Sequence, residues 1–275
     1  MGKPHILQLV THNGQFHADE VTAVALLHLF GKVNLAELKI SRTRDLQVIE
    51  QADIVLDVGA IYDVPSLRFD HHQIVGGSVS SAGMIWAWIR QTNTEHYPEI
   101  DLLIKAVDAH DCGVAMMPEF SFPDIIASYN DSDPLNDVLQ LSAFHNALQV
   151  ALTLLKSLID KQQQRLPALR MIEQAPVEII GSQHALVLAE YCKGWAELIN
   201  GQTAYKHITH VIWYVAQRDE WCVQVPAVKP HDFALAHARL QSDSNAKFVH
   251  QNGFFAVYKN KENIFKMLHR QSAAD

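Results

Sequence analysis

Histidine and acidic side chains gather in four short segments of the first 113 residues. These are residues 11–20 (THNGQFHADE), 53–59 (DIVLDVG), 69–72 (FDHH) and 108–113 (DAHDCG). A mixture of imidazole and carboxylate ligands favours Mn²⁺, Fe²⁺, Co²⁺ or Zn²⁺ over the oxygen-only site that Ca²⁺ prefers. The four segments together therefore predict a transition-metal centre.

The number of acids and histidines is sufficient for two ions. Two metal ions about 3.5–4 Å apart need one bridging carboxylate and separate ligands for each ion. Asp57 ends an apolar run and is placed to bridge. One ion is assigned His12 and His17, and the other is assigned Asp19, His71 and Asp111. Each segment alone has an ordinary alternative, such as a surface histidine pair or a capping acid at Asp70, so the prediction rests on all four.

A sheet edge must gather these side chains. Apolar runs at residues 5–10, 38–43 and 53–58 read as buried strands, and residues 18–30 and 46–51 between them have helical patterns. This alternation predicts an α/β fold with right-handed crossovers and a mostly parallel sheet. Because ligands bind beyond the carboxyl ends of such strands, His12, Asp57 and His71 are expected at one edge.

The remaining elements predict further parts of the chain. Residues 80–91 and 99–110 look helical, and a long helical pattern runs from the Asp133–Pro134 start signal to about residue 172, interrupted near Pro167. Strand-like runs at 177–180, 185–189, 210–215 and 221–225 precede a helix at 264–270. We expect a metal-binding catalytic domain over residues 1–134, a helical connector over 135–175, and a smaller α+β substrate-binding domain over 176–275.

Composition narrows the function classes. With 48% hydrophobic and 19% charged residues among 275, the chain is not intrinsically disordered. No apolar run approaches the ~20 residues of a membrane span, so no membrane partner is expected. The N-terminus lacks a signal-peptide pattern, and three cysteines without metal-like spacing suit a reducing compartment, so a cytoplasmic location is expected.

Charge points to a small anionic partner. The net charge of −8 disfavours a protein that coats long nucleic acid by charge alone. Residues 228–275 carry 7 Lys and Arg against 4 Asp and Glu, a net +3, so the remainder nets −11. An acidic body suits metal cations and a basic tail suits an anionic substrate, although ordinary surface scatter explains the same numbers.

The segments resemble the DHH phosphoesterase superfamily, and more specifically its MYG-type (melanocyte-proliferating-gene) exonuclease family. The resemblance rests on THNGxFHxDE at 11–20, RTRD at 42–45, DIVxDVG at 53–59, DHHQ at 70–73, SSAG at 80–83 and DxxDxG at 108–113. It implies a 3′–5′ exonuclease-like hydrolase with two divalent ions, expected to be Mn²⁺, that acts on RNA or short oligonucleotides. His17 stands where the superfamily's first motif has an acid, as it does in the MYG-type family.

The resemblance also implies roles for single residues. Asp57 matches the bridging acid and His71 a metal ligand. His72 matches the second histidine, which lies near the scissile phosphate, so His72 and Asp57 are the predicted catalytic residues. Asp111 matches the ligand of the fourth motif, with Asp108 as its support or substitute.

Substrate contacts are predicted from basic residues and a helix start. Guanidinium groups match phosphate oxygens, so Arg42, Arg44 and Arg68 are candidates, with surface ion pairing to Asp45 or Asp70 as the alternative. Ser80 and Ser81 could present backbone N–H groups to an anion or simply cap a helix. In the C-terminal domain the candidates for holding the substrate backbone are Arg239, Lys247, His250 and Gly253; a hairpin turn at Asn252–Gly253 is the alternative.

Two rival functions stay open. A small-phosphate hydrolase, acting on pyrophosphate or a nucleotide phosphate, would use the same dinuclear site, so the four segments cannot separate it from a nuclease. A non-catalytic metal- or nucleic-acid-binding module is disfavoured because every predicted ligand is present.

Overall fold

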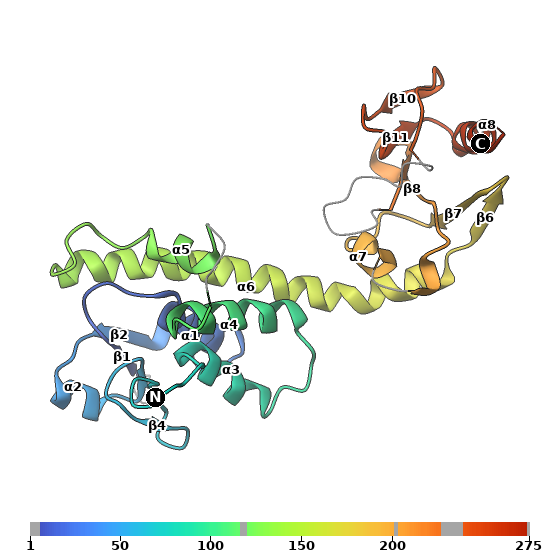
Figure 1. Ribbon diagram of the computed structural model, residues 1–275. Helices are drawn as coiled ribbons and strands as arrows, with labels where there is room; N and C mark the ends of the chain where they lie inside the picture. Colours follow the sequence, from blue (N-terminus) through green and yellow to red (C-terminus); the bar gives the residue numbers. More distant parts are fainter. Residues whose placement is uncertain (1–5, 116–119, 201–202, 227–238, 274–275) are drawn as a thin grey trace, which may run out of the picture. The chain divides into compact units, whose positions relative to one another are not determined.

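The chain forms two compact units, Met1–Asp160 and Lys161–Asp275. The computed structural model describes residues 6–115, 120–200, 203–226 and 239–273 (Figure 1). The first unit holds a five-stranded sheet and the second a six-stranded sheet, each with helices against it. The α/β class is confirmed, whereas the three predicted domain limits stay a prediction.

The sheet of the first unit is mostly parallel, with the order β2-β1-β3-β5-β4. β1 (Leu7–Thr11) pairs in parallel with β2 (Leu38–Arg42) and with β3 (Ile54–Leu56), and β3 pairs in parallel with β5 (Arg68–Phe69). β4 (Tyr62–Asp63) runs antiparallel to β5. The residues that follow β1, β3 and β5 therefore leave the sheet at the same edge.

Five helices accompany this sheet, namely α1 (Ala18–Leu29), α2 (Leu46–Gln51), α3 (Ser81–Arg90), α4 (Pro98–Asp111) and α5 (Phe122–Ala127). The residues of α1 are buried from Ala18 to Leu27, because α3, α4 and α5 all contact this helix. Gly31, at a φ of +70°, follows its end in the left-handed conformation common after helices. A helix buried this completely fixes the position of whatever its first turn carries.

The long helix α6 (Asp137–Gln174) differs from the expectation in two ways. It begins after Asn136, whose Oδ1 accepts a hydrogen bond from the N–H of Leu139 (3.2 Å), while Asp133 caps only a preceding turn. It also continues through Pro167, so the predicted interruption is wrong. Pro167 and Gln163, whose carbonyl lacks the usual donor at position 167, are both exposed, so water can serve that carbonyl.

Among the described helices, α6 is also long and apolar enough, by length and composition, to cross a membrane. Of its most apolar window, 39% is buried inside the structure. The core helix of a soluble protein passes the same test, so this is weak evidence. The absence of a membrane partner stays a prediction.

The second sheet has the order β10-β11-β9-β8-β7-β6. Its strands are β6 (Val177–Ile180), β7 (Gln183–Leu188), β8 (His210–Val215), β9 (Glu220–Gln224), β10 (Ala246–Val249) and β11 (Phe255–Tyr258). β7 and β8 are parallel, and the other described pairs are antiparallel.

Both faces of this second sheet are covered. Ala185 and Val187 pack in a core with α8 (Lys261–Ser272), whereas the alternate residues Leu186 and Leu188 pack with α7 (Trp195–Asn200) and the end of α6. Side chains of a strand point to opposite faces in turn, which accounts for two separate cores. The predicted strands of this region are confirmed, and the hairpin alternative at Asn252–Gly253 is correct for β10 and β11.

Candidate metal centre

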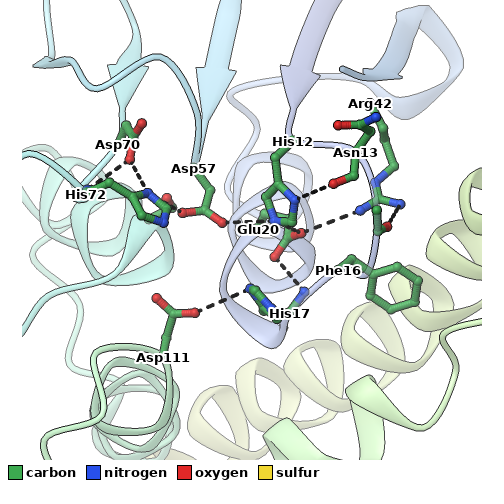
Figure 2. A network of polar contacts seen from close by, with 12 residues as sticks. His12, Asn13, Phe16, His17, Glu20, Arg42, Asp57, Asp70, His72 and Asp111 are labelled. Carbon is green, nitrogen blue, oxygen red and sulfur yellow. Dashed lines mark hydrogen bonds and ion pairs between the residues drawn. The ribbon is translucent and has the colours of Figure 1, made fainter. Parts of the chain in front are cut away.

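The carboxyl edge of the first sheet gathers the predicted ligands. His12 follows β1, Asp57 follows β3, and Asp70 to His72 follow β5. The first turn of α1 adds Asp19 and Glu20 after His17, and the last turn of α4 adds Asp111. Figure 2 shows His12, Glu20 and Asp57 turned toward one another, with His17 and Asp111 close by.

Asp57 lies between two imidazoles. Its Oδ2 is 3.2 Å from His12 Nε2, and its Oδ1 is 3.2 Å from His71 Nε2. The residue is only 2% exposed. The two oxygens of this carboxylate thus face different histidines, and the bridging role of Asp57 between two ions stays a prediction.

The backbone of Asp57 is unusual and serves this placement. Its φ is +55°, in the left-handed region, where aspartate is among the better tolerated non-glycine residues. Its N–H donates to the carbonyl of Phe69 (3.0 Å), which keeps the end of β3 on β5. A conformation that costs about 1–2 kcal/mol is kept only where its surroundings enforce it, and such positions cluster at functional sites.

A set of acceptors converges around His12. His12 Nδ1 is 3.0 Å from the carbonyl of Asn13, an arrangement that places the proton of the neutral ring on Nδ1. Nε2 then carries a lone pair, yet it faces Glu20 Oε1 at 3.1 Å and Asp57 Oδ2 at 3.2 Å. Neither Nε2 nor Glu20 Oε1 has a hydrogen-bond partner of acceptable geometry. Such a group needs a cation or a proton at its centre, and a divalent ion fits the donors.

A second donor group lies on the other side of Asp57. His71 Nε2 is 3.0 Å from Asp111 Oδ2, and His17 Nδ1 is 3.8 Å from Asp111 Oδ1. Asp19 is fully buried, and neither of its carboxylate oxygens has a hydrogen-bond partner. His17, Asp19 and Asp111 can bring ligand atoms within 4.8 Å of one another. All six predicted ligands are therefore brought together.

Burial and neighbouring charges both shift the pKa values of the acids and histidines of the centre. Burial raises the pKa of Asp19 well above its usual value, and repulsion from Asp57 and Glu20 adds to this rise. Burial also favours a raised pKa for Asp57, but His12 and His71 outweigh it and hold that pKa well below the usual range. For His12, burial lowers the pKa, yet the adjacent Asp57 and Glu20 raise it to about 10. A divalent ion bound at the same atoms would displace imidazole protons.

The predicted ligands do not include two donors that the structure places at the centre, Glu20 and Cys112; for Cys112, the sequence favours a buried structural thiol over a role in tuning the site. Glu20 is fully buried; its Oε2 accepts from the N–H of His17 (2.9 Å) and its Oε1 faces His12. An acid three residues after a helix start is normally assigned to helix capping, and this assignment leaves its second carboxylate oxygen out of account. Cys112 Sγ lies 3.8 Å from His71 Nδ1, on the side of the ring away from Asp57.

His72 occupies the open side of the centre. Its side chain is 62% exposed, and its Nδ1 lies 2.7 Å from Asp70 Oδ1 and 3.5 Å from Asp57 Oδ1. Asp70 is buried and also accepts from the N–H groups of His72 (3.0 Å) and Ala60 (2.6 Å). Asp70 therefore orients His72, which stays accessible to a substrate.

Comparison with known proteins identifies the family. A family model named for MYG1 exonucleases, described as an uncharacterised protein family (UPF0160), matches residues 8–271. The chain belongs to the MYG1 exonuclease family. The predicted resemblance to the MYG-type family is thereby confirmed.

Individual relatives share different parts of the chain. The MYG1 protein of Chlamydia trachomatis is 42% identical over 159 residues, which cover 55% of this chain and 53% of that protein. The MYG1 exonuclease of Homo sapiens is 28% identical over 316 residues, with 94% and 83% coverage. The chain thus spans about half the length of the chlamydial relatives that it matches. RecJ of Thermus thermophilus in complex with Mn²⁺ is 13% identical, covers 97% of this chain and 51% of that one, and has a TM-score of 0.29.

In this member of the MYG1 family, Asp108 contacts the start of α3. Its Oδ1 accepts from the N–H (2.9 Å) and the Oγ (2.7 Å) of Ser80. A Cβ on Gly83 would come within 2.5 Å of the same carboxylate. The carboxylate thus occupies the N-terminus of α3, where an anion is favoured.

The substrate roles predicted for Ser80 and Ser81 stay predictions, and several of the polar groups that would serve them already have partners within the protein. The N–H and hydroxyl of Ser80 are already used by Asp108, and Ser81 Oγ donates to the carbonyl of Phe69 (2.9 Å). Both serines are fully buried. The helix start does bind an anion, but that anion is a side chain of the protein.

Replacing Asp108 by alanine should lower stability and leave the metal content unchanged. The change leaves the buried N–H and hydroxyl of Ser80 without a hydrogen-bond partner, which should lower the free energy of unfolding by about 1–3 kcal/mol. Urea unfolding measures the loss, and elemental analysis of the Mn²⁺-loaded protein measures the ions. Loss of an ion in a folded Asp108→Ala variant would restore Asp108 as a ligand.

Two of the three arginines predicted to bind phosphate make hydrogen bonds within the protein. Arg42 is buried, donates to the carbonyl of Gly14 (3.0 Å), and lies 3.9 Å from Glu20 Oε1. Arg68 donates to four backbone carbonyls, at the closest to Ala52 (2.8 Å), and so joins β5 to the end of α2. Phosphate contact by these two arginines stays a prediction, and it would require their N–H groups to leave the partners that they have in this structure.

Arg44 remains available at the edge of the centre. It is exposed and donates to the carbonyl (2.6 Å) and the side-chain oxygen (2.8 Å) of Asn13, next to His12. The ion pairs with Asp45 or Asp70 that formed the alternative for the arginines do not occur among the described residues.

The predicted substrate residues of the second unit lie on or beside the hairpin of β10 and β11. Lys247 Nζ pairs with Glu220 Oε1 (2.7 Å), and the His250 ring lies 4.2 Å from that of Phe254, centroid to centroid. Gly253 has a φ of +67°, and a Cβ there would lie 2.7 Å from the carbonyl of Leu240, next to the exposed Arg239. The structure thus gives Gly253 a role in the turn itself.

Proposed function

We propose that this chain is a metal-dependent exonuclease that hydrolyses phosphodiester bonds of RNA or short oligonucleotides in the cytoplasm. One observation carries the proposal: each carboxylate oxygen of the buried Asp57 faces a different imidazole, inside a set of converging acceptors. The exonuclease names of the mammalian relatives support it.

The donor set divides between two divalent ions, for which Mn²⁺ is the expected metal. His12, His17 and Glu20 would hold one ion, while Asp19, His71 and Asp111 would hold the other, with Asp57 shared. Two such ions, when bound, supply an activated water and neutralise charge on a phosphoryl group.

His72 is the residue proposed to meet the substrate. Asp70 accepts from its Nδ1, so its Nε2 remains for an oxygen of the reacting phosphate. With Nδ1 donating to Asp70, Nε2 also donates to that oxygen when the ring is in its imidazolium form, in which both nitrogens carry a proton, and this stabilises the negative charge that develops there. Asp70 holds the ring and does not itself touch the substrate.

The phosphate backbone of the substrate needs cations beyond the metal centre. Arg44 is the proposed contact in the first unit, and Arg239, Lys247 and His250 are those in the second. Lys247, whose own side chain is exposed, would exchange its ion pair with the half-buried Glu220 for a phosphate. The overall charge of −8 favours short substrates over long ones.

An assay on matched substrates tests the proposal. End-labelled RNA and DNA pentamers of one sequence, and pyrophosphate, are incubated with the full chain and Mn²⁺, with EDTA in a parallel reaction. We expect fastest cleavage of RNA, release of mononucleotides from one end, and no reaction in EDTA. Hydrolysis of pyrophosphate alone would instead establish a small-phosphate hydrolase, and internal cleavage would contradict the exonuclease assignment.

A further inference from the structure

A cavity lies in the second unit, at the carboxyl ends of β7 and β8. Its volume is about 590 Å³, and its lining comes from residues 189–191 after β7 and 213–218 at the end of β8. β7 and β8 are parallel, with Leu188 opposite Trp213, so both segments leave the sheet at one edge. Ligands of α/β proteins bind at such edges, and the volume is that of a small-molecule site.

The cavity offers an aromatic ring on a rigid base. Tyr191 is 57% exposed, and its ring centroid lies 5.6 Å from that of Trp213. Trp213 is buried and is backed by Trp195 at 6.0 Å and Phe255 at 6.1 Å. An exposed ring held in this way can stack a base of any sequence at little cost in conformational entropy.

The lining also carries a cation that pairs with no carboxylate of the described residues. Arg218 is exposed, and among the residues that the structure describes no carboxylate lies within ion-pair distance of it. The neighbouring Asp219 is occupied by Lys259 and by the hydroxyl of Tyr214. A guanidinium in this state is suited to a phosphate group. Glu190, on the other lining segment, offers a carboxylate to ribose hydroxyls or to a base amino group.

We propose that this cavity binds one nucleotide, with its base stacked on Tyr191 and its phosphate on Arg218. The assignment of that nucleotide to an oligonucleotide substrate rests on the proposed nuclease function, whereas the binding itself does not. The cavity belongs to the second unit, whereas the proposed metal ligands all belong to the first.

Fluorescence titration of the full chain tests this site. AMP, adenosine and inorganic phosphate are titrated in EDTA, so that metal-bound phosphate makes no contribution, while tryptophan emission is followed. We expect saturable binding of AMP that is tighter than that of adenosine or phosphate. Tyr191→Ala should weaken AMP binding about ten-fold or more, and Tyr191→Phe should retain it.

Matched variants separate the two contacts. Arg218→Gln should weaken AMP binding several-fold and leave adenosine binding unchanged, because only AMP carries phosphate. Arg165→Gln, at an exposed arginine of the same unit outside the cavity, should bind AMP as the wild type does. Circular dichroism confirms that each variant is folded.

Three results would overturn the proposal: no saturable AMP binding at millimolar concentration, wild-type binding by Tyr191→Ala, or phosphate binding as tight as AMP binding. These outcomes are distinct from failure of the nuclease function. If RNA is not hydrolysed but AMP binding depends on Tyr191 and Arg218, the cavity assignment stands. If RNA is hydrolysed and Tyr191→Ala binds AMP normally, the cavity assignment alone fails.

Discussion

Replacing Asp57 by asparagine is expected to empty the metal centre and to lower phosphodiesterase activity at least about 1000-fold. Asparagine keeps the volume of the side chain and tolerates the left-handed backbone, so the fold at the end of β3 is preserved. The carboxylate charge that faces His12 and His71 is lost, and with it the shared ligand. Loss of both ions removes the main electrostatic stabilisation of the transition state.

Elemental analysis of the Mn²⁺-loaded protein, together with kcat on an RNA pentamer, measures this effect. His17→Ala is the matched comparison, because His17 lies at the edge of the cluster, 3.8 Å from Asp111, and should weaken only one ion. Two ions retained in a folded Asp57→Asn protein would contradict the bridging assignment.

Replacing His72 by alanine is expected to lower kcat about 100- to 10,000-fold and to leave both ions in place. The ring is mostly exposed and is held by Asp70, so its removal does not open the buried donor set. A loss confined to the transition state lowers kcat with little change in KM. Asp70→Asn should give a smaller loss of kcat, since it loosens the ring without removing it.

His71→Ala provides the contrast to this variant. His71 Nε2 lies between Asp57 and Asp111, so its removal should release metal as well as activity. If His72→Ala releases metal to the same extent, His72 is a ligand, and the division of roles between the two histidines is wrong.

The sheet edge, and the gathering at it of the six side chains predicted as ligands, could be predicted from local patterns. Apolar runs before His12 and Asp57 are long enough to mark buried strands, and parallel pairing then brings their ends together. In the second sheet, residues on both faces are buried, so its strands also appear in the sequence as continuous apolar runs. β4 and β5, at two residues each, carry too little pattern to be found.

The partners of polar side chains could not be predicted in the same way. Arg68 meets four carbonyls and Ser80 meets Asp108, 28 residues away, and nothing in either residue type distinguishes such a partner from a phosphate. Glu20 was not recognised as a donor because its position also fits a capping residue at the start of α1. Pro167 stands in a helix at a point where Gln163, whose carbonyl lacks its usual donor, is exposed to water.

Because α6 belongs to both units, it determines whether the chain can be divided into separate fragments. The helix crosses the limit between the two units, with Leu155 packed in one core and Ala168 in another. A cut between Asp160 and Lys161 would leave the last carbonyls of one fragment and the first N–H groups of the other without partners. A fragment that ends at Asp160 lacks the second part of α6, and a fragment that begins at Lys161 lacks the first part. Dissection by substitution within the intact chain is therefore sounder than dissection by truncation.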